Sequence, residues 1–185
     1  MKVRPWSPND LRRHIDTAVE IYCAAMAYPS ATGQQRKGYV LVHTSRAGFR
    51  CMGAHDDAGN IVGFAYGYRG TPGQWWHDEV RRDLHPALVQ RWLADPFELC
   101  ELHVRPEHQG QGIGQDLLIR LLDGCPQQTV VLSTPEGASR AWRLYRRLGF
   151  VDVRRHHTFA GDDREFAVLG RPLPISGPPV PATRG

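Results

Sequence analysis

The sequence ELCELHVRPEHQGQGIG, residues 98–114, decides the fold prediction for this chain. A predicted strand ends at Val104, and a glycine-rich turn follows that opens the predicted helix 112–123. Gly110, Gly112 and Gly114 remove the side chains that would keep a ligand from the backbone, and the first N–H groups of a helix have no partner within it. With the positive end of the helix dipole, these amides are predicted to hold a phosphate group.

Two common nucleotide-binding motifs are excluded at this turn. No lysine followed by serine or threonine comes after the glycines, as a Walker A loop requires. A dinucleotide-binding turn needs an acidic residue about 20 residues later on a second strand, and the candidate, Asp123, falls inside the predicted helix. Taken alone, the turn also fits a tight strand-to-helix connection that binds nothing.

Two blocks of sequence resemble the GNAT family of N-acetyltransferases. The stretch QGQGIG, residues 109–114, follows LHVRP at 102–106 and is similar to the acetyl-CoA motif of the family. The second block, AWRLYRRLGF at 141–150, is similar to the family's A-x-x-L-Y-x-x-x-G-F helix. The resemblance covers roughly residues 49–153. Ala138 departs from the family's pattern, because many members carry asparagine there, seven residues before the tyrosine.

The resemblance implies that acetyl-CoA is the co-substrate. No metal is expected, because the histidines and cysteines lack the spacing of metal ligands. Backbone amides of the turn are implied to bind the CoA pyrophosphate, and the residues concerned are Gln109, Gly110, Gln111, Gly112, Ile113 and Gly114. The backbone of His103 and Val104 is implied to pair with the pantetheine arm, as an added strand would.

The resemblance also implies direct attack of a primary amine on the acetyl thioester. Tyr145 matches the family's general acid, since a phenol with a pKa of about 10 can protonate a thiolate at neutral pH; a tyrosine that only packs its helix is the alternative. Glu98 is the candidate base, with Glu101 or ordered water as alternatives. Strand side chains alternate, so Glu98 is expected on one face, and Glu101 and His103 on the other.

Residues 69–96 are predicted to form an insertion between two strands, and Trp75 and Trp76 lie in it. Adjacent tryptophans are expected to clamp an organic amine by stacking or cation–π contact, which favours a small-molecule amine as acceptor. One ring that plugs the core is the alternative. Two further functions stay open: acetylation of a protein lysine or N-terminus, and a non-catalytic CoA-binding sensor or interaction module of the same fold.

The periodicity around these blocks predicts one α/β (α+β) domain over residues 1–171. A helix is predicted from Leu11 to near Pro29, and a hairpin from strands 49–55 and 61–68. Strand 97–104, helix 112–123, strand 130–134, helix 139–148 and two last strands at 150–153 and 165–169 follow. With the resemblance, we expect a mixed, mostly antiparallel central sheet of about six to seven strands with helices on both faces. Residues 172–185, rich in proline, are expected to be a disordered tail.

Composition excludes several functional classes. The chain has 185 residues and a net charge of +4, but arginine and acidic residues interleave, so no nucleic-acid partner is expected. The four cysteines lack the spacing of a metal or redox site. No run approaches the ~18–20 apolar residues of a membrane span, and no secretory signal is evident, so no membrane partner and a cytoplasmic location are expected. The oligomeric state is left open, and a homodimer is among the states allowed.

Overall fold

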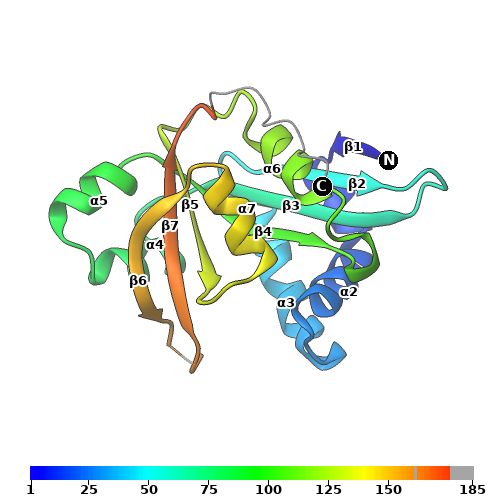
Figure 1. The fold of residues 1–185 in the computed structure, drawn as a ribbon, viewed down its shortest axis with the longest axis horizontal. Helices are drawn as coiled ribbons and strands as arrows, with labels where there is room; N and C mark the ends of the chain where they lie inside the picture. The colour runs from blue at the N-terminus through cyan, green and yellow to red at the C-terminus, as the bar shows by residue number, and fades with distance from the viewer. Residues whose placement is uncertain (161, 176–185) are drawn as a thin grey trace.

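A computed structural model of the chain describes residues 1–160 and 162–175. Its strands form a seven-stranded sheet in the order β1-β2-β3-β4-β5-β7-β6 (Figure 1). The strands are β1 (Lys2–Pro5), β2 (Arg50–His55), β3 (Ile61–Arg69), β4 (Pro96–Val104), β5 (Thr129–Pro135), β6 (Val151–Thr158) and β7 (Glu165–Pro172). The helices are α1 (Pro8–Arg13), α2 (Ile15–Met26), α3 (Ser30–His43), α4 (Trp75–Arg82), α5 (Pro86–Trp92), the 3-10 helix η1 (Pro106–His108), α6 (Ile113–Leu122) and α7 (Arg140–Arg147).

The predicted fold class is confirmed, because the sheet is mixed and mostly antiparallel and helices cover both of its faces. Only the β4–β5 pair is parallel among the strand pairs of the described residues. Alternate residues of β5 enter different cores: Val130 and Leu132 pack with α6 and α7, whereas Val131 packs with α4 and α5. A third core lies under α1, α2 and α3, where Phe64 and Tyr66 of β3 are buried.

Helix α6, which follows the glycine-rich turn, packs its apolar face against the sheet. Leu117, Leu118 and Leu121 recur at helical spacing and are fully buried against the strands. Burial of each such side chain contributes about 1.5–3 kcal/mol. The apolar face of α6 therefore fixes the position of the turn that precedes it.

Several elements differ from the sequence-based prediction. The first predicted helix is two helices, α1 and α2, separated at His14. Strand β1 and helix α3 were not predicted, and α3 carries a mainly polar sequence with few inward-facing apolar residues, Val40 among them. The insertion at 69–96 holds two short helices, α4 and α5, which close the core beside β5, β6 and β7.

The predicted tail begins inside the fold. Pro172 pairs with Thr129, and the backbone N–H of Leu173 donates to Gln128 O at 2.9 Å. Ile175 packs against the main core, which is the core that α6 and α7 form with the sheet. Residues 176–185 of the predicted tail lie outside the described residues. In the part of the chain that the structure describes, no helix is both long and apolar enough to cross a membrane.

Candidate active site

The parallel strands β4 and β5 pair over only three residues and then separate. Their ladder ends where Glu98 lies opposite Val131, although β4 continues to Val104 and β5 to Pro135. Figure 1 shows the two strands diverging, with α7 beside the point of divergence. Beyond Glu98, the edge of β4 that faces β5 is therefore available to pair with an extended ligand.

A bulge in β4 changes which side chains share a face. Tyr66 pairs with Glu101 and Gly67 pairs with Leu99, so Cys100 has no partner residue in β3. A Cβ atom at Gly67 would come within 2.2 Å of the Glu98 carbonyl oxygen, which shows how closely the strands approach there. The expected alternation is therefore wrong: the extra residue places Glu98, Glu101 and His103 on one face of β4.

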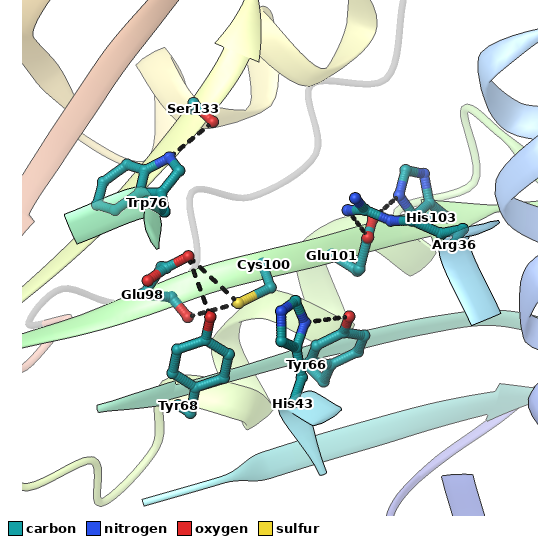
Figure 2. Close-up of polar contacts among 10 residues, drawn as sticks. All are labelled: Arg36, His43, Tyr66, Tyr68, Trp76, Glu98, Cys100, Glu101, His103 and Ser133. Atoms are coloured by element: carbon teal, nitrogen blue, oxygen red, sulfur yellow. Dashed lines mark hydrogen bonds and ion pairs between the residues drawn. The ribbon is translucent and has the colours of Figure 1, made fainter. Parts of the chain in front are cut away.

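The carboxyl group of Glu98 lies near the end of the ladder and is 5% exposed. The Tyr68 hydroxyl lies 3.5 Å from its Oε1 atom and the Cys100 thiol lies 3.6 Å from the same oxygen (Figure 2). Oε2 has no hydrogen-bond partner among the described residues. Burial raises the pKa of Glu98 to about 7, against smaller lowering effects of Cys100, Tyr68 and the charge of Arg46. This carboxyl group can therefore accept a proton near neutral pH.

Glu101 lies on the same face but in a different environment. Its carboxylate forms an ion pair with Arg36 of α3 and contacts His103 Nε2 (Figure 2). Burial raises the pKa of Glu101, but the charge of Arg36 and the contacts with His103 lower it further, to about 2. Arg36 also lies over the Tyr22 ring, 5.1 Å from its centroid. Glu101 is therefore held as a carboxylate and is a poorer candidate base than Glu98.

Some residues near the face of β4 that carries Glu98 and Glu101 were not predicted from the sequence as site residues. His43 of α3 has Nδ1 3.0 Å from the Tyr66 hydroxyl, and its ring lies 5.1 Å from the Tyr68 ring. Burial, assisted by the charge of Arg36, lowers the pKa of His43 to about 4. The alternation of Phe64, Tyr66 and Tyr68 in β3 was available in the sequence, but the proximity of Tyr66 and Tyr68 to His43 depends on α3.

The predicted phosphate cradle opens α6. Gly110 and Gly112 adopt φ angles of 80° and 82°, which favour glycine, and a Cβ atom at either would meet nothing within 4 Å. Ile113 points into the core, so only its backbone faces the turn. The first bond of the helix runs from Asp116 N to Gly112 O at 3.0 Å, and no side chain of residues 1–160 or 162–175 forms a cap at Gly112. The backbone amides from Gly110 to Gln115 have no backbone acceptor among the described residues and are therefore available to an anion. The amide of Gln109, which was expected in this set, instead donates to Pro106 O at 3.2 Å.

The side chain of Gln109 holds the glycine-rich turn in place with two hydrogen bonds. Its Nε2 donates to Val104 O at 2.9 Å, and its Oε1 accepts from Arg140 of α7 at 2.9 Å. Gln109 thereby links the end of β4, the glycine turn and α7. Gln111 is exposed beside it.

Tyr145 of α7 is 6% exposed and lies in the main core, on the face of the sheet opposite Glu98. Its ring lies 5.4 Å from the Phe150 ring. Burial, and to a smaller extent the negative charge of Glu101, raises the pKa of Tyr145, which keeps the phenol protonated. The β4–β5 ladder ends at Glu98, so the gap between these strands lies between the face that carries Glu98 and the face that carries Tyr145.

The two tryptophans of the insertion have different surroundings. Trp76 is 8% exposed in the core beside β5, and its Nε1 donates to Ser133 Oγ at 3.1 Å. Figure 2 shows Trp76 and Glu98 on the same side of β4. Trp75 is 59% exposed, with its ring 5.4 Å from that of Phe159. The two rings therefore do not enclose an amine between them, because the Trp76 ring is buried in the core.

Comparison with known proteins identifies the family. A family model described as "Acetyltransferase (GNAT) family" matches residues 15–150. The chain belongs to the GNAT family of acetyltransferases. This GNAT chain is 41% identical to a GCN5-like protein acetyltransferase of Mycobacterium tuberculosis, over 91% of its own length and 96% of that protein. It is 32% identical to the ribosomal protein bS18-alanine N-acetyltransferase of Escherichia coli, over 48% of its own length and 62% of that protein.

Solved structures share the GNAT fold. A putative acetyltransferase from Salmonella typhimurium, solved with acetyl-CoA, has a TM-score of 0.63 and 20% identity over 98% of each chain. A putative GNAT acetyltransferase from Desulfovibrio desulfuricans has a TM-score of 0.65 and 15% identity over 95% of this chain and 99% of the other. Among residues 1–160 and 162–175 of this N-acetyltransferase, no three His, Cys, Asp or Glu side chains are grouped to hold a metal ion.

Proposed function

We propose that this enzyme transfers the acetyl group of acetyl-CoA to a primary amine, with Glu98 as the base and Tyr145 as the acid. The observation that carries the proposal is the state of Glu98. It is buried where β4 and β5 separate, one of its oxygens has no partner among the described residues, and burial raises its pKa to about 7. A base with a pKa close to the operating pH is the most effective.

The residues present fit acetyl-CoA. The free amides at the start of α6 suit the pyrophosphate, since Gly110 and Gly112 put no side chain in the way. The edge of β4 at His103 and Val104, beyond the last pair with β5, suits the pantetheine arm, with Val104 O already accepting one hydrogen bond from Gln109 Nε2. Related folds from Salmonella typhimurium and Thermoplasma acidophilum were solved with acetyl-CoA and with coenzyme A, which supports the same ligand here. The reaction needs no metal in this proposal.

The proton transfers follow from the two faces of the sheet. Glu98 Oε2 accepts the proton of the incoming ammonium, which leaves a neutral amine able to form a C–N bond to the acetyl carbon. As the C–S bond breaks, the Tyr145 hydroxyl gives its proton to the CoA sulfur. The acetylated nitrogen loses its second proton to solvent water, and Tyr145 regains a proton from the same source. The separation of β4 from β5 lets Glu98 act from the side of α3 and Tyr145 from the side of α7.

The acceptor amine has two candidates. A lysine or N-terminal amine of a protein is proposed first, because the relative that aligns with 91% of this chain carries the name of a protein acetyltransferase. A small-molecule amine is the second, and the exposed Trp75 on the insertion favours it. In the sequence, Trp75 and Trp76 together favoured a small-molecule acceptor. Because Trp76 is buried, its ring is not available to contact such an acceptor.

Measurement of CoA release tests this function. The wild-type protein is incubated with acetyl-CoA and a panel of lysine peptides, N-terminal peptides, polyamines and amino acids, and acetylated products are identified by mass spectrometry. We expect CoA release with at least one amine and its loss in Glu98→Gln. Tight acetyl-CoA binding without release on any acceptor would favour a non-catalytic CoA-binding module instead.

A further inference from the structure

Glu98 Oε2, an acceptor, and Arg46 Nε, a donor, are buried and have no hydrogen-bond partner among the described residues. Arg36 Nε is unpartnered as well, but the guanidinium of Arg36 is held by its ion pair with Glu101. Leaving a buried polar atom unsatisfied costs about 1–3 kcal/mol, so such atoms in a native protein call for an explanation. A ligand that supplies a donor to Glu98 and an acceptor to Arg46 would satisfy both.

The turn that carries Arg46 is fastened beside Glu98. It follows α3, and Arg69 N donates to Ala47 O at 3.0 Å. Gly48 lies so close to β3 that a Cβ atom there would be 3.1 Å from Arg69 Cβ. Tyr68 immediately precedes Arg69 and is the β3 partner of Glu98. Arg46 therefore belongs to a turn that is hydrogen-bonded to the end of β3, next to Tyr68, the strand partner of Glu98.

The charge of Arg46 reaches the site and is not neutralised there. It lowers the pKa of Glu98 and of His43. Arg36, the other arginine close to this face, forms an ion pair with Glu101. Arg46 is half-buried and forms no ion pair with any residue in the described part of the chain. A half-buried guanidinium that has no ion-pair partner among the described residues, and whose charge acts on the candidate base, is suited to bind a carboxylate.

We propose that Arg46 binds a carboxylate of the acceptor while Glu98 receives the proton of its amine. The preferred acceptor is then an amine that carries a carboxylate nearby, either an amino acid or a lysine flanked by an acidic residue. Polyamines, which bring only positive charge, are disfavoured by the same arginine. This inference rests on the proposed acetyl transfer and adds the chemical class of the acceptor.

Matched acceptor pairs test this inference. One arm uses ω-amino acids of increasing chain length, each compared with its amide, and the second uses lysine peptides with glutamate or glutamine beside the lysine. We expect the wild type to favour the carboxylate member in at least one arm by about ten- to hundredfold in kcat/KM, the value of a charge-assisted hydrogen bond. The arm with the larger preference identifies the source of the carboxylate.

Substitution of Arg46 completes the test. Arg46→Gln is expected to abolish the preference by lowering kcat/KM for carboxylate acceptors only, with acetyl-CoA binding unchanged, and Arg46→Lys is expected to retain part of it. Arg81→Gln removes an equal charge from the exposed surface of α4 and is expected to keep the full preference. Equal loss for both members of each pair in Arg46→Gln, or no preference in an active wild type, would overturn this inference alone. No CoA release with any amine would overturn the acetyl transfer as well.

Discussion

Glu98 and Glu101 share one face of β4 although three positions separate them, because Cys100 forms a bulge between them. Their surroundings differ in one respect that decides their chemistry. Glu101 has Arg36 as an ion-pair partner and a pKa of about 2, whereas Glu98 has no ion pair with any described residue and a pKa of about 7. Of these two carboxyl groups, Glu98 is the one that changes its protonation near neutral pH.

The pH dependence of the reaction is expected to report Glu98. Only its deprotonated form accepts a proton, so kcat/KM should fall below pH 7, by up to about tenfold per pH unit, in addition to the dependence from the acceptor amine. Glu98→Gln is expected to lower kcat by about 10²–10⁴-fold and to lose this inflection. Initial rates of CoA release between pH 5 and 9 check both effects. Glu20→Gln, an exposed change on α2, should keep the wild-type profile; an inflection that survives in Glu98→Gln would exclude Glu98 as the base.

The same substitution is expected to raise stability at high pH. The folded-state pKa of Glu98 is about 7 and its ordinary value is 4.5, so the folded protein holds the proton more tightly and wild-type stability falls as pH rises between these values. The difference corresponds to about 3 kcal/mol. Glutamine does not titrate, so urea unfolding should show Glu98→Gln gaining free energy of unfolding relative to wild type from pH 4.5 to pH 8. An equal difference at both pH values would contradict the raised pKa.

Tyr145→Phe is expected to lower the rate of acetyl transfer while leaving the stability of the fold nearly unchanged. The ring stays in the core, and no hydrogen bond from its hydroxyl to another described residue is present, so the free energy of unfolding should change by less than about 1 kcal/mol. Loss of the proton donor should lower kcat by about 10²-fold or more without weakening acetyl-CoA binding. Single-turnover rates and calorimetric binding measure the two effects. With Tyr39→Phe, an exposed tyrosine on α3, neither should change, and a normal rate in Tyr145→Phe would remove the proposed acid.

Gly112→Ala is expected to weaken acetyl-CoA binding. Gly112 has a φ of 82° at the start of α6, and an alanine forced into that conformation costs about 1–2 kcal/mol or moves the amides. Gly124→Ala is the matched control, because Gly124 also has a positive φ, 62°, and open space around it, but follows the far end of α6. Both variants should lose similar stability. If Gly124→Ala weakened acetyl-CoA binding as much, the turn at Gly112 would not be the phosphate cradle.

A glycine in the sequence carried a signal for the bulge. Gly67 interrupts the strand pattern of β3, and a glycine inside a strand often marks a bulge or a close backbone approach. Strict alternation along β4 was the simpler assumption, and it separated Glu98 from Glu101. The bulge could not be assigned to Cys100 without the partner strand, because register is a property of two strands together.

Helix α3 was missed for a different reason. Its sequence, SATGQQRKGYVLVH, shows little amphipathic periodicity, and its helical structure depends on packing against α2 and, through Val40, against β3. Arg36 contacts Glu101 and His43 contacts Tyr66 because the fold places α3 next to β3 and β4. No local pattern identified them as site residues.

The sequence by itself determined the elements whose signals are local. The turn at 109–114 and the helix after it, the hairpin of β2 and β3 and the block at 141–150 each depend on periodicity, glycine conformation or a short motif, and the structure contains all of them. Tertiary structure alone decided the protonation states of Glu98 and Glu101, the separate surroundings of Trp75 and Trp76 and the position of Arg46. The physical reason is that burial and Coulomb interactions depend on which distant segments meet, and those contacts exist only after the sheet has formed.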